Sequence, residues 1–229
     1  KRLHIVYLSA SREGDWERVN LPDELSKLGT VTCYFVRDQV DFPFDMITSH
    51  KEWVNIRPRV DDNLFHFMAS LHMRNSVDLV LSYLSGTHVS ARTINQIGSL
   101  GIPVVAFHLD DRLFFRGFKV GSQWSGMLSI CRSYDLNLSN ALKSLVKYRV
   151  EESNVLFWPE GANAQHFIPK HLPYKYDVSF IGARYGLRGP FIEKLREQGI
   201  KVDCFGKGWE NGAVSAEEML NIYSQSRIN

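Results

Sequence analysis

Short runs of apolar and β-branched residues alternate along this chain with segments in which apolar residues recur at helical spacing. Strands of a parallel sheet are buried on both faces and appear as continuous apolar runs, and helical connections carry the chain between parallel neighbours. The pattern therefore predicts an α/β domain, built on a Rossmann-like parallel sheet, in residues 1–158. Six strands are predicted there: Leu3 to Leu8, Val31 to Val36, Leu79 to Tyr83, Val104 to Phe107, Leu136 to Leu138 and Val155 to Trp158.

Helical spacing is clear in two of the connections between these strands. One helix face is traced by Val60, Leu64, Phe67, Met68 and Leu71, and the next by Ile94, Ile97 and Leu100. Residues at this spacing lie on one side of a helix, so both segments are predicted to pack on the sheet.

The pattern is weaker in two other connections. Ser139 is a residue type that caps helix N-termini, so we expect a helix from Ser139 to about Arg149. Its inward face is predicted to carry Leu142, Leu145 and Val146. The stretch from Asp38 to Pro58 is interrupted by Pro43 and Pro58, which predicts an irregular loop.

A second domain is predicted to begin at residue 177. Over residues 159–176 the apolar pattern lapses and glycine and proline accumulate, as is typical of an interdomain linker. The predicted elements of residues 177–229 are a strand from Asp177 to Ile181, a helix from Phe191 to Gln198, a strand from Val202 to Phe205, a helix from Ala216 to Ser224, and the beginning of a third strand. These elements make about half of a doubly wound domain, so we expect this chain to end inside its C-terminal domain.

Two strands of this second domain end in glycine turns that carry basic residues. Pro190 suits the first turn of a helix that follows the first of these turns. A phosphate there would meet backbone N–H groups, the positive end of the helix and guanidinium groups. For either turn alone, an ordinary connection with solvated basic side chains is the alternative. The candidate phosphate-binding residues are Gly182, Arg184, Arg188, Gly206, Lys207 and Gly208.

Polar residues also follow strands of the first domain. Asp110 and Asp111 come after the strand Val104 to Phe107, at the carboxyl end where open α/β sheets bind ligands. One of two adjacent carboxylates can serve as a general base. We favour Asp110 in that role and interpret Asp111 as a cap, a solvated side chain or a partner of Arg112. His108 is the other candidate base, although a histidine that ends an apolar strand is more often a packed core residue. Substrate-binding candidates from the other loops are Gly14, Gly86 and His88.

Composition excludes several classes of function. The net charge is +2 and the basic residues are scattered among 25 acidic ones, so no surface for nucleic acid is expected. No apolar run is long enough to span a membrane. Cys33, Cys131 and Cys204 are isolated, which predicts no metal site and suits a cytoplasmic protein. The fingerprints of dinucleotide binding, of phosphate loops, of paired-histidine zinc sites and of nucleophile elbows are missing from the sequence.

Several segments, taken in order, resemble one family. They are Ile102 to Asp111, Trp158 to Asn163, Tyr176 to Gly182, Val202 to Trp209 and Tyr223 to Asn229. Together they resemble the spore-maturation-protein-like glycosyltransferases. The resemblance implies a GT-B architecture, in which the C-terminal Rossmann-like domain holds a nucleotide-sugar donor and the N-terminal one holds the acceptor. It also implies metal-independent, hexosyltransferase-like transfer without a cofactor. Glu160, in the second of these segments, is a further substrate-binding candidate.

The expected function is therefore transfer of a sugar from a nucleotide-sugar to an unidentified acceptor, by a chain whose donor domain is incomplete and which is weakly active. Negative charge that builds on the leaving diphosphate would be met by Arg184, Arg188 and Lys207. The alternative is a non-catalytic module that binds a sugar or a nucleotide on the same sheets. An incomplete second sheet would leave an unpaired edge, so self-association into an oligomer is compatible with the sequence.

Overall fold

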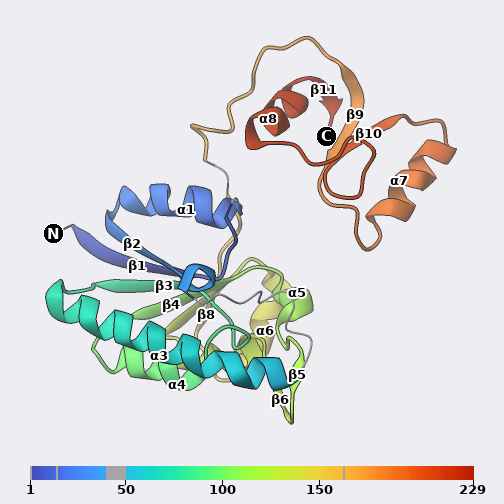
Figure 1. Ribbon diagram of the computed structural model, residues 1–229. Coiled ribbons are helices and arrows are strands. Elements are labelled where there is room, and N and C mark those ends of the chain that lie inside the picture. Colours follow the sequence, from blue (N-terminus) through green and yellow to red (C-terminus); the bar gives the residue numbers. More distant parts are fainter. Residues whose placement is uncertain (1, 14, 40–49, 162) are drawn as a thin grey trace. The chain divides into compact units, whose positions relative to one another are not determined.

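The computed structural model describes residues 2–13, 15–39, 50–161 and 163–229 (Figure 1). The chain divides into two compact units, residues 1–160 and residues 161–229. Each unit is built on a parallel sheet with helices packed on it.

The first unit contains a six-stranded sheet in the order β2-β1-β3-β4-β7-β8. Neighbouring strands are parallel throughout. Its strands are β1 (Leu3–Ser9), β2 (Gly29–Phe35), β3 (Leu79–Tyr83), β4 (Val104–His108), β7 (Leu136–Ser139) and β8 (Val155–Phe157). All six predicted strands are confirmed, with ends that differ by no more than about two residues from the predicted ones. A short antiparallel hairpin, β5 (Lys119–Val120) and β6 (Gln123–Trp124), was not predicted.

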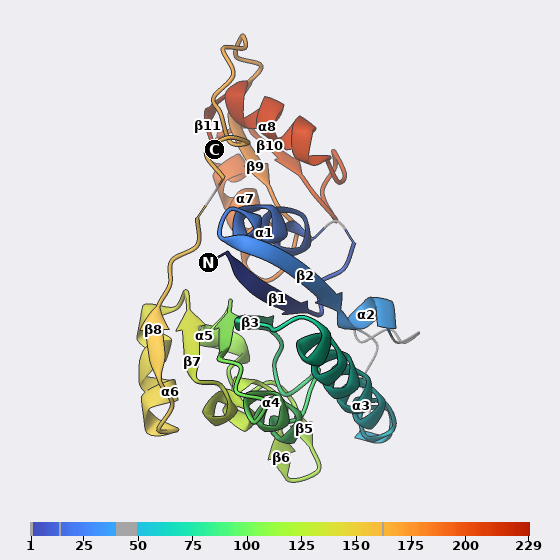
Figure 2. The ribbon, with the colours of Figure 1, turned by 90° about the vertical axis from the view of Figure 1, so that its left-hand side faces the viewer.

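Helices cover both faces of this sheet, as Figure 2 shows. They are α1 (Trp16–Ser26), α2 (Val36–Gln39), α3 (His50–Arg74), α4 (Ala91–Gly98), α5 (Asp111–Phe114) and α6 (Leu145–Val150), with 3₁₀ turns η2 (Met127–Ser129), η3 (Cys131–Ser133) and η4 (Leu142–Ser144). Alternate residues of β1 point to opposite faces, so Val6 and Leu8 pack with α3 and α4, and Ile5 and Tyr7 pack on the side of α1. The predicted faces of α3 and α4 are confirmed, because Val60, Leu64, Met68, Ile94 and Ile97 are all buried.

The loop predicted from Asp38 to Pro58 is wrong at both of its described ends, because α2 extends to Gln39 and α3 begins before Pro58. Helix α3 begins at His50 and continues through Pro58, which is exposed. Ile56 is buried one turn before Val60, so the apolar face of α3 extends beyond the segment in which its spacing was recognised. Packing of this face stabilises the helix against the cost of a proline in its interior. Residues 40–49, with Pro43, lie outside the described residues.

The helix predicted from Ser139 to about Arg149 is confirmed near its end, but its start is wrong and only Leu145 of its predicted inward face packs against the core. Ser139 ends β7, and its hydroxyl donates a hydrogen bond to Asp111 Oδ2 at 2.6 Å. Helix α6 begins six residues later, and Ser144 occupies its N-cap position without a side-chain hydrogen bond to the helix. Leu142 and Val146 are 63% and 62% exposed, so they do not form an inward face. The fully buried Tyr148 anchors this helix instead.

The second unit contains a three-stranded parallel sheet in the order β10-β9-β11. Its elements are β9 (Tyr176–Ile181), α7 (Arg188–Glu197), β10 (Val202–Phe205), α8 (Ala216–Ser224) and β11 (Ser226–Ile228). All five predicted elements are confirmed. Ser215 and Glu218 form a capping box at the start of α8, which explains its sharp beginning. The core of the unit is small: Ile192, Val202, Cys204 and Trp209 form its buried cluster, and Phe205 and Ile222 are also buried.

Candidate functional site

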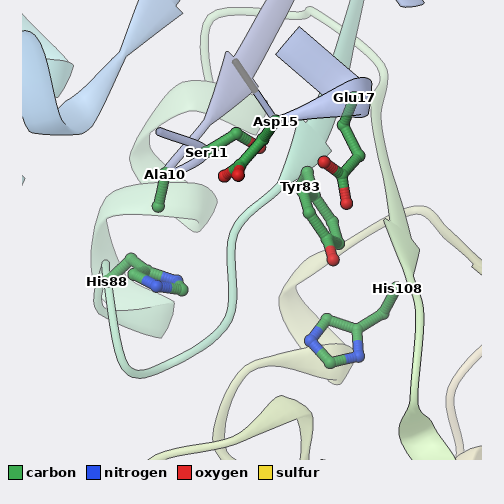
Figure 3. A pocket seen from close by; sticks show the side chains of 7 residues that line it. All are labelled: Ala10, Ser11, Asp15, Glu17, Tyr83, His88 and His108. Atoms are coloured by element: carbon green, nitrogen blue, oxygen red, sulfur yellow. The ribbon is translucent and has the colours of Figure 1, made fainter. Parts of the chain in front are cut away.

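A cavity of about 360 Å³ lies at the carboxyl ends of β1, β3 and β4 (Figure 3). Strand β1 has β2 on one side and β3 on the other, so the connections that follow β1 and β2 leave in opposite directions. Open α/β sheets bind ligands at such a switch point. The cavity is lined by Ala10, Ser11, Asp15, Glu17, Tyr83, His88 and His108.

His108 lines the cavity and is held by a buried carboxylate. Its Nδ1 lies 2.7 Å from Asp111 Oδ1, and the Asp111 side chain is fully buried. The His108 side chain is 15% exposed, so the imidazole connects the buried carboxylate with the cavity. Figure 3 shows the ring of His108 facing the hydroxyl end of Tyr83.

The Asp111 carboxylate is satisfied by partners from distant parts of the sequence. Its Oδ2 accepts hydrogen bonds from Ser139 Oγ at 2.6 Å and from Tyr148 OH at 2.7 Å. Lys147 Nζ donates to the backbone oxygen of Asp111 at 2.6 Å, so α6 fixes both the side chain and the backbone of this residue. Burial, with the Asp111 carboxylate adding to it, raises the pKa of Tyr148, which therefore stays protonated and donates.

This arrangement selects one tautomer of His108. A carboxylate only accepts hydrogen bonds, so the proton of the neutral imidazole lies on Nδ1, toward Asp111. The lone pair of Nε2 is then available, and Nε2 makes no hydrogen bond to the described residues. A histidine oriented in this way is a suitable general base, and the carboxylate behind it stabilises the imidazolium that forms.

Two carboxyl groups line another part of the cavity. Burial is the largest influence on the Glu17 carboxyl and raises its pKa; a hydrogen bond from Tyr83 acts in the opposite direction. Asp15 Oδ2 accepts a hydrogen bond from the backbone N–H of Arg12 at 2.6 Å. Burial also raises the pKa of Tyr83, so its hydroxyl stays protonated near neutral pH. The cavity therefore offers acceptors and a hydroxyl, which are the groups that bind polyols.

His88 lies across the cavity from His108 (Figure 3). Its Nδ1 accepts a hydrogen bond from the backbone N–H of Ser85 at 3.2 Å. Burial lowers the pKa of His88 to about 3, and the charges of Arg37 and His108 act in the same direction. The ring is therefore neutral at physiological pH and carries its proton on Nε2, as a hydrogen-bond donor.

Gly86 has a steric role beside this cavity. A Cβ at this position would lie 2.0 Å from Ser129 Oγ and 2.9 Å from the backbone oxygen of Ser125. Only glycine fits that approach, which holds the turn after β3 against the segment before η2. The structure thus explains Gly86 by packing, while His88 two residues later supplies the polar contact.

The structure separates the two adjacent aspartates. Asp110 is exposed and has a left-handed backbone with φ of 62°. That turn directs the chain so that Asp111, one residue later, is fully buried. The interpretation of Asp111 as a solvated side chain or a partner of Arg112 is therefore wrong, because its carboxylate is paired with His108 inside the unit.

The charges of the other acceptor-side candidates act on cavity residues, that of Glu160 on Glu17 and that of Asp110 on Tyr83. Glu160 is exposed and accepts a hydrogen bond from Asn140 Nδ2. Neither Asp110 nor Glu160 belongs to the lining residues of the cavity. Gly14 lies outside the described residues.

The six predicted phosphate-binding residues lie together at the carboxyl ends of β9 and β10 in the second unit. The two turns are joined by hydrogen bonds: the backbone N–H of Arg184 donates to the Lys207 oxygen at 2.9 Å, and Trp209 Nε1 donates to the Gly182 oxygen at 2.8 Å. Gly206 has φ of 123°, and a Cβ there would lie 2.5 Å from the Gly182 oxygen. The Trp209 side chain has a packing role, since it is buried in the core of the unit.

The basic side chains of these turns have contacts within the unit. Arg184 forms an ion pair with Glu193, and its guanidinium lies 5.2 Å from the centre of the Trp209 ring. Arg188 donates to the Ala183 oxygen at 3.0 Å and lies 4.1 Å from the centre of the Tyr185 ring. Lys207 and Gly208 are exposed. An anion at these turns would therefore compete with Glu193 for Arg184 and would find Lys207 in water.

Several residues of the site were not predicted. Glu17 and Tyr83 line the cavity, and Ser139 and Tyr148 hold Asp111. Tyr83 ends a predicted strand. The reasoning from strand ends that made Asp110 a candidate therefore applies equally to Tyr83. Ser139 and Tyr148 lie 28 and 37 residues from Asp111, so no local pattern connects them with it.

Among residues 2–13, 15–39, 50–161 and 163–229, no group of three or more histidine, cysteine or carboxylate side chains is placed to hold a metal ion. In the same ranges, no helix is both long and apolar enough to cross a membrane.

The sequence matches no family model and no curated protein. Solved structures do match. The lipopolysaccharide outer core galactosyltransferase WaaB, in its apo form, is 10% identical, with a TM-score of 0.54 over 99% of this chain and 67% of its own. UGT89C1 of Arabidopsis thaliana, complexed with UDP-L-rhamnose, is 11% identical, with a TM-score of 0.50 over 93% of this chain and 69% of its own. Both neighbours are GT-B glycosyltransferases, and at this identity the likeness shows the fold: the chain has the α/β, GT-B-like fold predicted from its sequence.

Proposed function

We propose that this protein is a glycosyltransferase that moves a sugar from a nucleotide-sugar donor to a hydroxyl group of an acceptor, with His108 as the general base. The observation that carries the proposal is the His108–Asp111 pair at the switch point of the first sheet. The GT-B-like fold supports it, because the solved structures of similar fold are named as a galactosyltransferase and as a complex with UDP-L-rhamnose. Fold likeness alone does not establish chemistry, which depends on the residues of the site.

The proposed reaction is a single displacement. The acceptor hydroxyl donates a hydrogen bond to Nε2 of His108, and its oxygen attacks the anomeric carbon as the bond to the diphosphate breaks. The hydroxyl proton moves to Nε2, and the resulting imidazolium is stabilised by the Asp111 carboxylate at 2.7 Å. Asp111 touches no substrate and is a positioning residue. Glu17, Tyr83 and the neutral His88 would bind the other hydroxyl groups of the acceptor.

The second unit would bind the donor without a metal ion. Charge on the leaving diphosphate would be met by Arg184, Arg188 and Lys207, and by the backbone of the glycine turns. The sequence resemblance to spore-maturation-protein-like glycosyltransferases supports this assignment and suggests a hexose as the transferred sugar. For Arg184 to contribute, its ion pair with Glu193 must open.

The test uses the natural protein that contains these 229 residues. Binding of UDP-, GDP- and dTDP-sugars is measured by saturation-transfer NMR, and release of the nucleoside diphosphate is followed with a panel of hydroxylated acceptors. We expect one nucleotide class to bind and to turn over. His108→Gln removes the base but keeps the size of the side chain, so it is expected to lower kcat by a factor of about 10² to 10⁴ with little change in donor affinity.

Asp110→Asn is the comparison that separates the two candidate bases. Asp110 is exposed and outside the cavity lining, so its replacement is expected to leave kcat within about threefold. If Asp110→Asn abolished transfer and His108→Gln did not, the base would be Asp110 and the mechanism above would be wrong.

A module that binds without catalysis is the second candidate. The observation that favours it is the engagement of Arg184 with Glu193 and of Arg188 with Tyr185, so that two of the three cations of these turns already have partners within the unit. In the same assay, this candidate predicts saturable binding of a nucleotide or sugar, no release of diphosphate with any acceptor, and no effect of His108→Gln.

A further inference from the structure

A second cavity, of about 370 Å³, shares His108 with the first. It lies where the turn after β3 faces the segment between α5 and η2. Its lining residues are Ser85, Thr87, His108, Phe114, Gly117, Phe118 and Gly126. His108 is the one residue that lines both described cavities, so a molecule in the second cavity can present a group to the proposed base.

The wall of the second cavity is held in place by a network of hydrogen bonds. Gly126 N–H donates to the Arg116 oxygen at 2.8 Å, and Ser125 N–H donates to the Phe118 oxygen at 2.9 Å. Thr87 Oγ1 donates to the Ser125 oxygen at 3.1 Å and ties this wall to the turn after β3. The two backbone segments of the wall approach each other closely. A Cβ at Gly117, where φ is 68°, would lie 2.5 Å from the backbone nitrogen of Gly126. The cavity is therefore a preformed feature of the backbone.

Two phenylalanines of this cavity are not part of the core. Phe115 is 5% exposed and packs against Tyr148, with ring centres 4.9 Å apart. Its neighbours Phe114 and Phe118 are 58% and 38% exposed, although they lie in the same short segment. The fold therefore buries one of three aromatic rings and leaves two at the cavity. Exposed aromatic surface at a concave site is typical of ligand binding.

The second cavity has few polar side chains in its lining. Apart from His108, the lining offers the hydroxyl groups of Ser85 and Thr87 and no charged side chain. Ser85 Oγ and Thr87 Oγ1 already have partners within the unit. A small set of polar groups beside aromatic and backbone surface suits a ligand that is mostly apolar and carries one reactive polar group.

We propose that this cavity binds an apolar group of the acceptor, aryl or acyl, and that the acceptor is therefore amphipathic. The inference rests on the proposed function, because it takes His108 as the base. The apolar group packs on Phe114 and Phe118, and the acceptor hydroxyl lies at Nε2 of His108, with the polar part of the acceptor in the first cavity. The structure thus assigns a substrate class to this cavity, whose Phe114 and Phe118 were not among the residues singled out in the sequence.

The first experiment measures binding without donor. The probes are p-nitrophenyl β-D-glucoside for an aryl group, octyl β-D-glucoside below its micelle concentration for an alkyl group, and methyl β-D-glucoside as the probe without either. We expect the wild-type protein to bind at least one apolar probe about tenfold or more tighter than the methyl glucoside, as measured by saturation-transfer NMR with saturation of the ring or chain protons. Which of the two binds better distinguishes a soluble aromatic acceptor from a lipid-like one. Equal affinity for all three probes would overturn the inference.

Variants locate the site. Phe114→Ala and Phe118→Ala remove the exposed rings, and each is expected to weaken binding of the preferred apolar probe about tenfold. Leu113→Ala is the matched control, because Leu113 lies on the same helix α5, is 71% exposed and is outside the cavity lining. Leu113 and Phe114 are 71% and 58% exposed, so thermal unfolding is expected to be unchanged in their two variants. Equal losses in the control and in the phenylalanine variants would overturn the assignment of the cavity.

A second readout separates this inference from the proposed function. With an active donor, transfer to the preferred apolar glucoside is compared with transfer to the methyl glucoside in wild type and in Phe118→Ala. Transfer with no preference between them, unaffected by Phe118→Ala, would overturn the apolar site and leave the glycosyltransferase standing. Binding of the apolar probe that depends on Phe114 and Phe118, without transfer from any donor, would support the site and overturn the proposed function.

Discussion

Replacing Asp111 with asparagine tests the link between the buried carboxylate and the proposed base. Asparagine has the same size, so the packing around Tyr148 and Ser139 is kept. The amide cannot balance the charge of an imidazolium, and its NH₂ group must face either His108 or the two hydroxyl donors. If the NH₂ group faces His108, the neutral ring turns its proton to Nε2 and loses the lone pair that accepts the acceptor proton.

The magnitude follows from the geometry. At 2.7 Å, the attraction between the Asp111 carboxylate and a His108 imidazolium is about 6 kcal/mol at an effective dielectric constant of about 20. This is an upper bound, because the amide keeps part of the hydrogen bond and water screens the cavity side of the ring. A loss of about 3 to 5 kcal/mol of transition-state stabilisation corresponds to a fall in kcat by a factor of about 10² to 10⁴.

The assay measures kcat and KM for donor and acceptor at several pH values in wild type, Asp111→Asn and Asp110→Asn. We expect kcat to fall in Asp111→Asn with KM changed by less than about threefold, since Asp111 contacts no substrate. Asp110→Asn makes the same chemical change one residue earlier, at an exposed carboxylate, and serves as the comparison. An Asp111→Asn enzyme that folds like the wild type and keeps more than about a tenth of its kcat would refute the role of the pair.

Three further predictions concern other parts of the chain. The pKa of His88 is about 3 in the folded protein and about 6.5 in the unfolded chain, so the unfolded chain gains the proton first as the pH falls. His88 therefore makes the free energy of unfolding decline below about pH 6.5. Between pH 7 and pH 5, urea unfolding is expected to show a decline that is about 2 kcal/mol larger in wild type than in His88→Asn. An equal loss in both proteins would place His88 in water. Gly206→Ala puts a Cβ 2.5 Å from the Gly182 oxygen and is expected to destabilise the second unit by about 1 to 3 kcal/mol. Gly161→Ala, with open space around the added Cβ, is expected to be neutral in the same thermal unfolding assay. A neutral Gly206→Ala would contradict the contact. Arg184→Ala is expected to weaken binding of a nucleoside diphosphate about tenfold, as measured by calorimetry. Arg132→Ala of the first unit is the control. Unchanged affinity in Arg184→Ala would mean that Arg184 contacts only Glu193 and Trp209 and does not bind the ligand.

Local pattern predicted most of the elements but missed two features of the helices. Helix α1 was not predicted, because Pro22 and its mixed surface hide the helical spacing. The start of α3 was placed too late for a similar reason: Pro58 resembles a boundary, while the buried Ile56 shows that the same face continues through it. In both cases packing against the sheet outweighs a local propensity, and a single sequence does not display that packing.

The sequence by itself determined the parallel strands, because continuous β-branched runs have few other places to be buried than the inside of a covered sheet. It also determined which residues stand at the carboxyl ends of those strands, since this depends only on position along the chain. Tertiary structure alone decided which of them act together. The register of β4 and β7 pairs His108 with Ser139, the left-handed turn at Asp110 sends Asp111 inward, and α6 brings Tyr148 to the same carboxylate. These contacts join residues about 30 to 40 positions apart, and their geometry is set by packing of whole elements, which no local spacing encodes.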